Sequence, residues 1–464
     1  MSAPLPILTP RRRSRLLLRI AAGLFGFLLM IGLVTLGIFT LTDTARSKGW
    51  AELARTLPEH KAAVRRQGIP LTAAQLKRSP PVPPDQNAAP IYLQIAAQYE
   101  QIPVAVRDVD NAALRAFNRP QRAKADRAAA RKILLRDAEI LRLAEKAVQR
   151  PGCDFARFWE QGNDARFPEF AAMRHVAHLL AARARFAIES GNPEAALKDI
   201  AAGMQVSNHV EQNPYLLDLL VGYAIEAIVD RPFLETLQQY GHRSDVLAGA
   251  SSAETVSPRT PSLRHAVAGE AFFACNTFRL LRETPEGLPD EIEKTWLAPI
   301  AARHREDALD AWESRTLAFW CDADRELKAA SGNLLAEHHG MKRVRERFAA
   351  QDLEPGYELT AAFTPTFDPF PAKTMQIAAY RVLRQQAVAL LRHRLANGQF
   401  PDSLSDLPEK KRIADPFTNQ RLRYRKTDTG FLLYSVGVNF TDDNGDDETI
   451  DRGNTLDLAF RYSR

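Results

Sequence analysis

The feature that most constrains this chain is an uninterrupted apolar segment near its N-terminus. Residues 20–42 carry no formal charge and open with the sequence IAAGLFGFLLMIGLVTLGIF. At a rise of about 1.5 Å per residue, a helix of this length can cross a hydrocarbon core of about 30 Å. The segment therefore predicts a transmembrane helix, which we place at residues 16–42.

Positive charge on one side of this segment predicts its orientation. Arginines precede it without any accompanying acid, at Arg11, Arg12, Arg13, Arg15 and Arg19. Because positive charge holds a short N-terminal tail in the cytoplasm, residues 1–15 are expected inside and residues 43–464 outside. A cleaved signal peptide would have a shorter apolar region of about 7 to 15 residues. We therefore expect an uncleaved signal anchor in a bacterial inner membrane.

The distribution of charge argues against nucleic acid as a partner. The chain has 62 basic and 56 acidic residues and a formal net charge of +6. Five of the basic residues precede the apolar segment, so the rest of the chain is nearly neutral. In the helical regions basic and acidic residues alternate, which is typical of solvated helix faces rather than of a phosphate-binding surface.

The body of the chain is predicted to be helical. Residues 91–241 are rich in Ala, Leu, Arg and Glu, with apolar residues at helical spacing. Within this domain, residues 122–148 predict one long amphipathic helix. Residues 167–189 and 193–210 predict a helical hairpin around a Ser-Gly-Asn turn. The hairpin resembles one tetratricopeptide-like unit, but no second copy follows at a fixed period, so a helix-repeat peptide binder is only a third possibility.

Proline-rich and polar stretches divide the remaining sequence. Residues 43–90 end in a proline-rich stretch, which predicts a juxtamembrane linker. Residues 242–262 are polar and hold two prolines, which predicts a second, exposed linker. A second helical region is expected at residues 263–371.

Large apolar side chains indicate where these helices are buried. Residues 216–240 form the most apolar exported segment, and we expect a central helix there, broken near Pro232. Trp296, Trp312 and Trp320 are expected in the core of the second helical region.

Motifs for the common catalytic chemistries are absent from the sequence. It contains no G-x-S-x-G elbow, no phosphate-binding G-x-x-x-x-G-K-[ST] loop and no G-x-G-x-x-G turn. Cys153, Cys275 and Cys321 form no C-x-x-C motif, although the last two can pair outside the cytoplasm. His175 and His178 can share a helix face, but no acid completes a metal-binding set, so packed or solvated histidines are expected. Catalytic residues are therefore unknown, and we do not favour an enzyme.

The sequence pattern changes at residue 372. Residues 373–396 predict a helix that an Asn-Gly pair terminates. Residues 421–425 and 431–436 predict a strand hairpin, and alternation over residues 456–461 predicts a third strand. Residues 372–464 are therefore predicted to form a small α+β module.

Short motifs occur in a fixed order in this module: Asn397-Gly398-Gln399-Phe400-Pro401, Asp415-Pro416-Phe417, Tyr434-Ser435-Val436-Gly437, and Asp457 opening the last strand. In this order they resemble the C-terminal domain of the major pseudopilins of type II secretion systems. The remainder looks like bacterial membrane-anchored helical proteins that carry the same tail. The resemblance implies an α+β fold and a calcium ion bound in the loop before the last strand.

Acidic residues of that loop are the candidate metal ligands. They are Asp442, Asp443, Asp446, Asp447, Asp451 and Asp457. Calcium takes about six to eight oxygen ligands and would neutralise carboxylates that otherwise repel one another. An EF-hand register fails here, because Gly445 at the turn position would put Phe440 at the first ligand position. A merely solvated acidic loop is the alternative.

These features together predict a mainly α protein with an N-terminal transmembrane helix, a helical body and a small α+β pseudopilin-like C-terminal module. The predicted function is a membrane-anchored extracytoplasmic scaffold or protein-interaction protein, with an envelope protein as partner and a calcium-stabilised tail, linked to secretion or envelope assembly. The alternative is a helical envelope hydrolase that uses acidic residues in a cleft. A buried pair of carboxylates in the largest pocket would favour the hydrolase.

Overall fold

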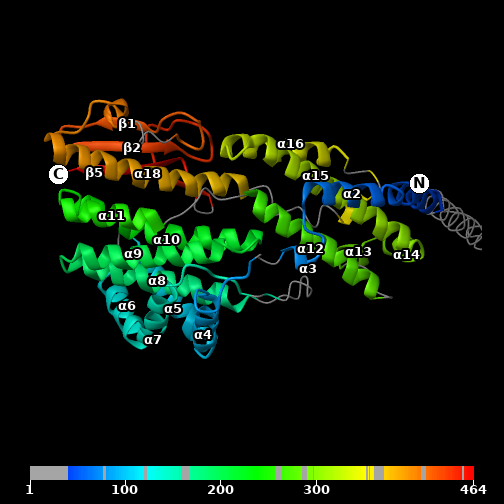
Figure 1. The fold of residues 1–464 in the computed structure, drawn as a ribbon, viewed down its shortest axis with the longest axis horizontal. Helices are drawn as coiled ribbons and strands as arrows, with labels where there is room; N and C mark the ends of the chain where they lie inside the picture. Colours follow the sequence, from blue (N-terminus) through cyan, green and yellow to red (C-terminus); the bar gives the residue numbers. More distant parts are fainter. Residues whose placement is uncertain are drawn as a thin grey trace, which may run out of the picture.

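The computed structural model describes most of the chain between residues 40 and 463. The described residues are 40–76, 80–119, 123–155, 157, 167–256, 263–284, 290–295, 297–351, 354, 356–359, 370–408, 414–451 and 454–463. Figure 1 shows an elongated molecule, with a small sheet near one end and the N-terminal helix at the other. The longest helices run along its length.

Helices dominate the described residues, as the sequence predicts. The first half contains α2 (Leu57–Gln67), α3 (Ala73–Leu76), α4 (Ala89–Glu100), α5 (Val104–Phe117), α6 (Lys124–Arg136), α7 (Ala138–Ala147), α8 (Pro168–Glu189), α9 (Pro193–Glu211) and α10 (Leu216–Tyr240). The second half contains α11 (Ser244–Val256), α12 (Leu263–Glu283), α13 (Asp290–Glu293), α14 (Ala298–Arg303), α15 (Arg305–Ala330), α16 (Leu334–Ala349) and α18 (Phe370–Asn397). The strands are β1 (Arg423–Lys426), β2 (Gly430–Val436), β3 (Thr449–Asp451), β4 (Asn454–Thr455) and β5 (Asp457–Ser463), after a short 3-10 turn at Leu404–Asp406.

The predicted fold class needs one correction, at the transmembrane helix. Among the residues that the structure describes, no helix combines the length and apolar character needed to cross a bilayer. The prediction of a membrane-spanning helix in this fold is therefore wrong for the described chain. Of the predicted span 16–42, residues 16–39 lie outside the described residues. The predicted orientation, with residues 43–464 outside the cytoplasm, stays a prediction.

The first described helix is held by charged contacts with the body. It runs from residue 40 to residue 54. Its Asp43 accepts hydrogen bonds from Arg303 and pairs with His304 at 3.2 Å. Its Arg46 donates to Glu358 at 2.8 Å. These polar contacts attach residues 40–54 to the helical body.

The hairpin of α8 and α9 confirms the sequence prediction almost to the residue. Asn192 accepts a hydrogen bond from the Ala195 amide at 3.0 Å and so caps α9, which begins with Pro193. Gly191 takes a φ of 75°, which a glycine adopts at little cost.

Two predicted helix boundaries are wrong. In place of the single helix predicted over residues 122–148 there are two helices, α6 and α7. They are separated at Asp137, which has a φ of −93° and a ψ of 21° and whose carboxylate contacts Arg136 and His175. Conversely, α10 continues through Pro232 without a break, since the helix is packed against α8, α9 and α18.

The predicted linker at residues 242–262 is wrong over residues 244–256, which form α11. Its Val246, Leu247 and Ala250 are buried against α9 and α18. Residues 257–262 lie outside the described residues. The serines of α11 and the two prolines that follow it in the sequence favoured a linker, although apolar residues recur along the helix.

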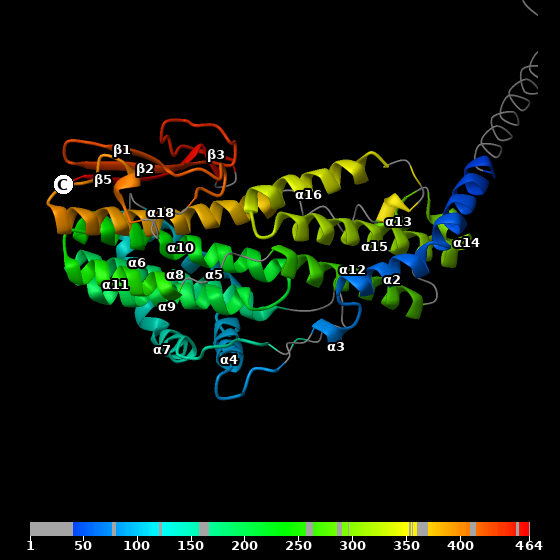
Figure 2. The same cartoon turned by 45° about the horizontal axis from the view of Figure 1, so that its top comes forward.

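One hydrophobic core joins the helical body to the C-terminal module. It contains buried side chains of α8, α9, α10, α11, α18 and the sheet. A second core lies among α4 to α10, and a third joins α2, α10, α12, α15, α16 and α18. Trp312 and Trp320 are fully buried, as predicted, whereas Trp296 lies outside the described residues. Helices α10 and α18 therefore connect both helical regions (Figure 2).

Three strands of the C-terminal module form an antiparallel sheet in the order β1-β2-β5, which confirms the predicted hairpin and third strand, and β3 and β4 pair separately. Its inner face packs on α18 through Phe431, Leu433 and Phe460. On the other side Gly445 lies so close to Leu432 that a Cβ atom added to this glycine would be 2.8 Å from Leu432 Cδ2. The acidic loop thus covers the outer face of the sheet.

Candidate functional sites

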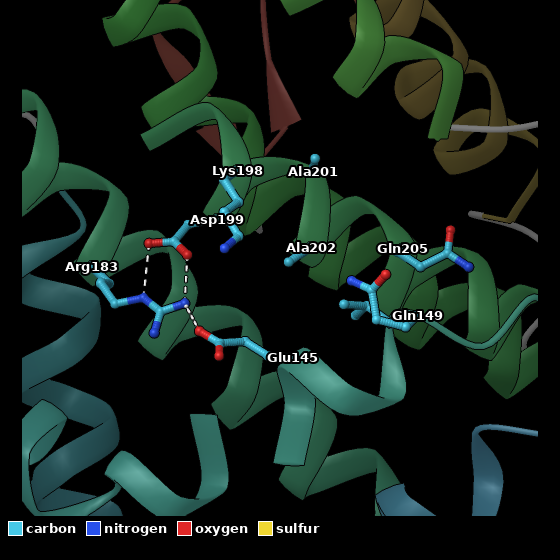
Figure 3. A pocket seen from close by; sticks show the side chains of 9 residues that line it. Glu145, Gln149, Arg183, Lys198, Asp199, Ala201, Ala202 and Gln205 are labelled. Carbon is cyan, nitrogen blue, oxygen red and sulfur yellow. Dashed lines mark hydrogen bonds and ion pairs between the residues drawn. The ribbon is translucent and has the colours of Figure 1, made fainter. Parts of the chain in front are cut away.

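A solvent-open hollow of about 360 Å³ lies between α7, α8 and α9. Figure 3 shows an ion-paired cluster at one end of it and two amide side chains at the other. Its lining residues are Glu145, Val148, Gln149, Arg183, Lys198, Asp199, Ala201, Ala202 and Gln205. We call this the α7–α9 hollow.

Arg183 joins the two carboxylates of the hollow. Its Nε and Nη2 atoms donate to the two oxygens of Asp199 at 2.9 and 2.6 Å, and Nη2 also donates to Glu145 at 2.7 Å. The three side chains come from three helices, since α7 carries Glu145, α8 carries Arg183 and α9 carries Asp199. The bidentate contact fixes the guanidinium plane against α9.

These three side chains differ in their exposure to solvent. The Asp199 side chain is 7% exposed, that of Arg183 is 33% and that of Glu145 is 43%. Burial raises the pKa of Asp199 above its ordinary value, although the hydrogen bonds from Arg183 oppose this. Lys198 beside it is exposed, and no ion pair of its ammonium group is found among the described residues. The hollow thus offers the Lys198 ammonium group, the partly exposed and paired side chains of Arg183 and Glu145, and the Gln149 amide, beside Ala201 and Ala202.

A second hollow, of about 370 Å³, lies over the proline-rich stretch. It is lined by Pro80, Pro81, Val82, Pro83, Gln86, Pro151 and Gly152. None of these side chains titrates, so this surface offers shape but no acid–base chemistry.

The acidic loop of the C-terminal module places its carboxylates in separate contacts. Asp442 accepts hydrogen bonds from Arg423 and from the Tyr434 hydroxyl, both at 3.0 Å. Asp447 pairs with Arg461 at 3.0 Å. These two predicted ligands are therefore neutralised by neighbouring side chains.

The remaining predicted ligands contact the amide groups of the loop. Asp443 accepts from the Asn439 amide at 2.8 Å, and Asp446 accepts from the Glu448 backbone at 3.0 Å. Asp457 accepts from the backbone amides of Asp443 and Gly445 at 3.2 and 2.7 Å. The side chain of Asp451 lies outside the described residues.

The described acids do not converge on one point. Among the described residues, no group of three or more His, Cys, Asp or Glu side chains is placed to hold a metal ion. One oxygen of Asp457 is buried without a hydrogen-bond partner, but one such atom does not make a calcium site. In the arrangement described, these residues do not fit the ion, and calcium binding stays a prediction from the sequence.

The histidine pair is packed, as expected. His175 contacts Asp137 at 2.8 Å through Nε2 and Asn111 at 3.3 Å through Nδ1. Burial lowers the pKa of His178 to about 4, so it stays neutral at physiological pH. Cys153, Cys275 and Cys321 are free and buried.

Sequence reasoning missed the α7–α9 hollow. Its acids look like ordinary solvated residues of amphipathic helices, and nothing local marks them. One signal was available: Arg183 and Arg185 interrupt an otherwise apolar stretch of α8, and an arginine on a buried helix needs a carboxylate partner.

Known proteins give no independent indication of identity. Comparison with protein-family models, with curated proteins and with solved structures finds no match to this chain. The resemblance of residues 372–464 to the major pseudopilins therefore stays a prediction.

Proposed function

We propose that this protein is a scaffold or protein-interaction protein that binds a short segment of a partner protein in the α7–α9 hollow. The observation that carries the proposal is the chemistry of the hollow's lining. A volume of about 360 Å³ lies in the range of pockets that hold small ligands, and a short peptide segment fits it where a folded surface would not. Gln149 offers an amide group, and Lys198 and Glu145 offer one charge of each sign. The Gln205 amide is already engaged, because its nitrogen contacts His209 at 2.8 Å and its oxygen accepts from Asn208 at 3.3 Å. Backbone amides of a partner segment match such groups.

The ion-paired cluster supports binding rather than catalysis. A hydrolase with two acids needs one carboxyl group that can donate a proton and one that can accept it. Both oxygens of Asp199 already accept from Arg183, and Glu145 shares the same guanidinium. The acids are also not a buried pair, because the Glu145 side chain is 43% exposed. The hydrolase alternative is therefore the weaker proposal.

Filling the hollow tests the proposal. An Ala202→Arg variant places a long side chain on the floor of the hollow without removing any of its ion pairs. The matched control is Ala128→Arg, on the exposed face of α6. Both variants should unfold at about the wild-type temperature.

Photo-crosslinking gives the readout. A photoreactive amino acid at position 149 should crosslink in cells to one discrete partner band, which Ala202→Arg abolishes and Ala128→Arg leaves unchanged. Crosslinks that survive Ala202→Arg, or that appear equally from a photoreactive residue at position 128, would contradict binding in the hollow.

A further inference from the structure

A second set of acids and arginines lies deep in the molecule, between α18 and the helices beneath it. α18 contributes Arg381 and Arg384, which are one helical turn apart and are 7% and 1% exposed. They face carboxylates from three other helices, namely Glu211 of α9, Glu226 and Asp230 of α10, and Glu254 of α11. We call these six side chains the buried network.

Arg384 is the centre of this network. Its Nε donates to Glu254 at 2.5 Å and its Nη2 donates to Glu226 at 2.8 Å. Its Nη1 donates to Asp230. One guanidinium therefore joins α18 to both α10 and α11.

Arg381 extends the network toward α9. Its Nε donates to the two oxygens of Glu226 at 2.9 and 3.0 Å, and its Nη2 contacts Glu211 at 3.3 and 3.4 Å. Glu226 thus lies between two guanidinium groups. Burial raises the pKa of Glu226, but attraction to Arg381 and Arg384 outweighs burial and lowers it to about 2.

The charges of the network do not balance if every acid is ionised. Four carboxylates face two guanidinium groups, and an uncompensated charge in a buried site is strongly unfavourable. Two carboxylate oxygens, Asp230 Oδ2 and Glu254 Oε2, are buried and accept no hydrogen bond from the described residues. If these carboxylates were ionised, their buried oxygens would carry negative charge without a hydrogen bond, which is unfavourable. Protonation of the carboxyl groups removes that excess charge.

Among the residues that the structure describes, neighbouring titratable groups do not supply the missing charge. Burial raises the pKa values of Tyr223 on α10 and Tyr380 on α18, so both phenols stay neutral. Arg231 of α10 is exposed. In the network itself, burial raises the pKa of Asp230 to about 7 and that of Glu211 to about 7, and it also raises the pKa of Glu254.

We propose that the buried network is a proton-dependent lock, which holds α18 against α10 and α11 while two of its carboxyl groups are protonated and loosens as those protons are lost. Because α18 leads into the sheet and packs on it, loosening α18 also frees the C-terminal module from the helical body.

The direction of the pH effect follows from proton linkage. In the unfolded chain Asp and Glu lose their protons near pH 4, whereas network carboxyls that keep their protons to about pH 7 make the folded form the better proton binder between these values. The attachment of α18 is therefore strongest at mildly acidic pH, weakens as the pH rises toward 7 and then levels off. Glu226 acts in the opposite direction, but only below about pH 4, where its unfolded form becomes protonated.

Hydrogen exchange of the full chain between pH 5.5 and pH 8 tests the lock. After correction for the intrinsic exchange rate, protection of α11 and α18 should fall by about tenfold or more, whereas protection of α4 and α7, which are remote from the network, should change much less. Equal pH dependence in both regions would overturn the proposal.

An Asp230→Asn variant separates the lock from a static ion-pair cluster. The amide keeps the oxygen that accepts from Arg384 but cannot titrate, so α18 should lose less protection between pH 5.5 and pH 8 than it does in the wild type. If all four acids are ionised in the native protein, the variant instead loses an ion-pair partner and protection falls at every pH with the slope unchanged. Asp322→Asn, which alters an exposed pair with Arg325, is the matched control and should change neither value.

Infrared spectroscopy covers the case in which Asp230→Asn fails to fold. In the wild-type chain, the band of protonated carboxyl groups should be present at pH 5.5. Burial also raises the pKa of Glu270 to about 8 and that of Glu337 to about 7, so these acids outside the network contribute to the band. A Glu211→Gln variant should therefore remove part of the band, and a band that this variant leaves unchanged would contradict the proposal. Absence of that band at pH 5.5 would overturn the proposal.

Discussion

The α7–α9 hollow and the buried network use the same chemical groups in opposite surroundings. In each, an arginine joins carboxylates of neighbouring helices. The Arg183 side chain is 33% exposed, whereas that of Arg384 is 1% exposed. Water screens the first group and leaves part of it accessible to a partner. In the second group burial makes every charge depend on its partners. Protons must therefore neutralise the carboxylates that the two arginines leave uncompensated.

Removing the buried cation should have the largest effect. Arg384→Met leaves Glu226, Asp230 and Glu254 without their shared partner, and breaking a buried pair in this way costs about 3 to 5 kcal/mol. Urea unfolding should show this loss in the free energy of unfolding. The control Arg325→Met, which breaks an exposed pair on α15, should cost about 0 to 1 kcal/mol. Similar costs for the two variants would erase the distinction between buried and exposed pairs.

Removing the exposed cation should have an intermediate effect. Arg183→Met deprives buried Asp199 of its two hydrogen bonds, but water reaches the site and Asp199 can take up a proton. We expect a loss of about 1 kcal/mol in the free energy of unfolding, measured in the same way. A loss as large as that of Arg384→Met would mean that the ion pairs of Arg183 hold the helices together rather than forming an accessible surface.

Asp199 should give a smaller, pH-dependent effect. Because burial raises its pKa in the folded protein, the folded form binds the proton more tightly, and the stability of the wild type falls as the pH rises from about 4 through that raised pKa. Asp199→Asn cannot titrate, so its stability relative to the wild type should improve over this range. Urea midpoints of both proteins at pH 4 and pH 7 measure the difference. A relative stability that worsens with pH would show that Arg183 lowers the Asp199 pKa instead.

Calcium should have the smallest effect if the loop keeps the arrangement described. Since Asp442 and Asp447 are paired with arginines and no three acids converge, thermal melts with calcium and with chelator should coincide. A calcium-dependent rise in melting temperature that Asp443→Asn, Asp446→Asn abolishes would instead support the site predicted from the sequence and show that the loop rearranges around the ion.

Local signals in the sequence predicted much of the fold. Asn192 and Pro193 specify the start of α9 through short-range hydrogen bonding and backbone geometry, and the hairpin of β1 and β2 follows from alternation. The break at Asp137 was missed because its partner His175 lies 38 residues away. α11 was missed because its serines and the two prolines that follow it are typical of a linker.

The partners within the buried network could not be predicted from the sequence. Arg384 contacts Asp230 across 154 residues and Glu254 across 130 residues. In sequence Arg381, Arg384 and Glu254 look like ordinary charged positions of helices. Glu226 and Asp230 lie on the predicted central helix and so need partners, but nothing local identifies those partners. Only the packing of α18 on α10 and α11 makes them a single group, and only burial gives that group its proton balance.

The slope of the unfolding free energy against pH tests the central difference between the two regions most directly, because it counts the protons that the folded protein holds in excess of the unfolded chain. Between pH 5 and pH 7 the wild-type free energy of unfolding should fall, and Asp230→Asn combined with Glu211→Gln should make the slope clearly shallower. Asp322→Asn should leave it unchanged. A slope that the double substitution does not alter would contradict a proton-bearing buried network.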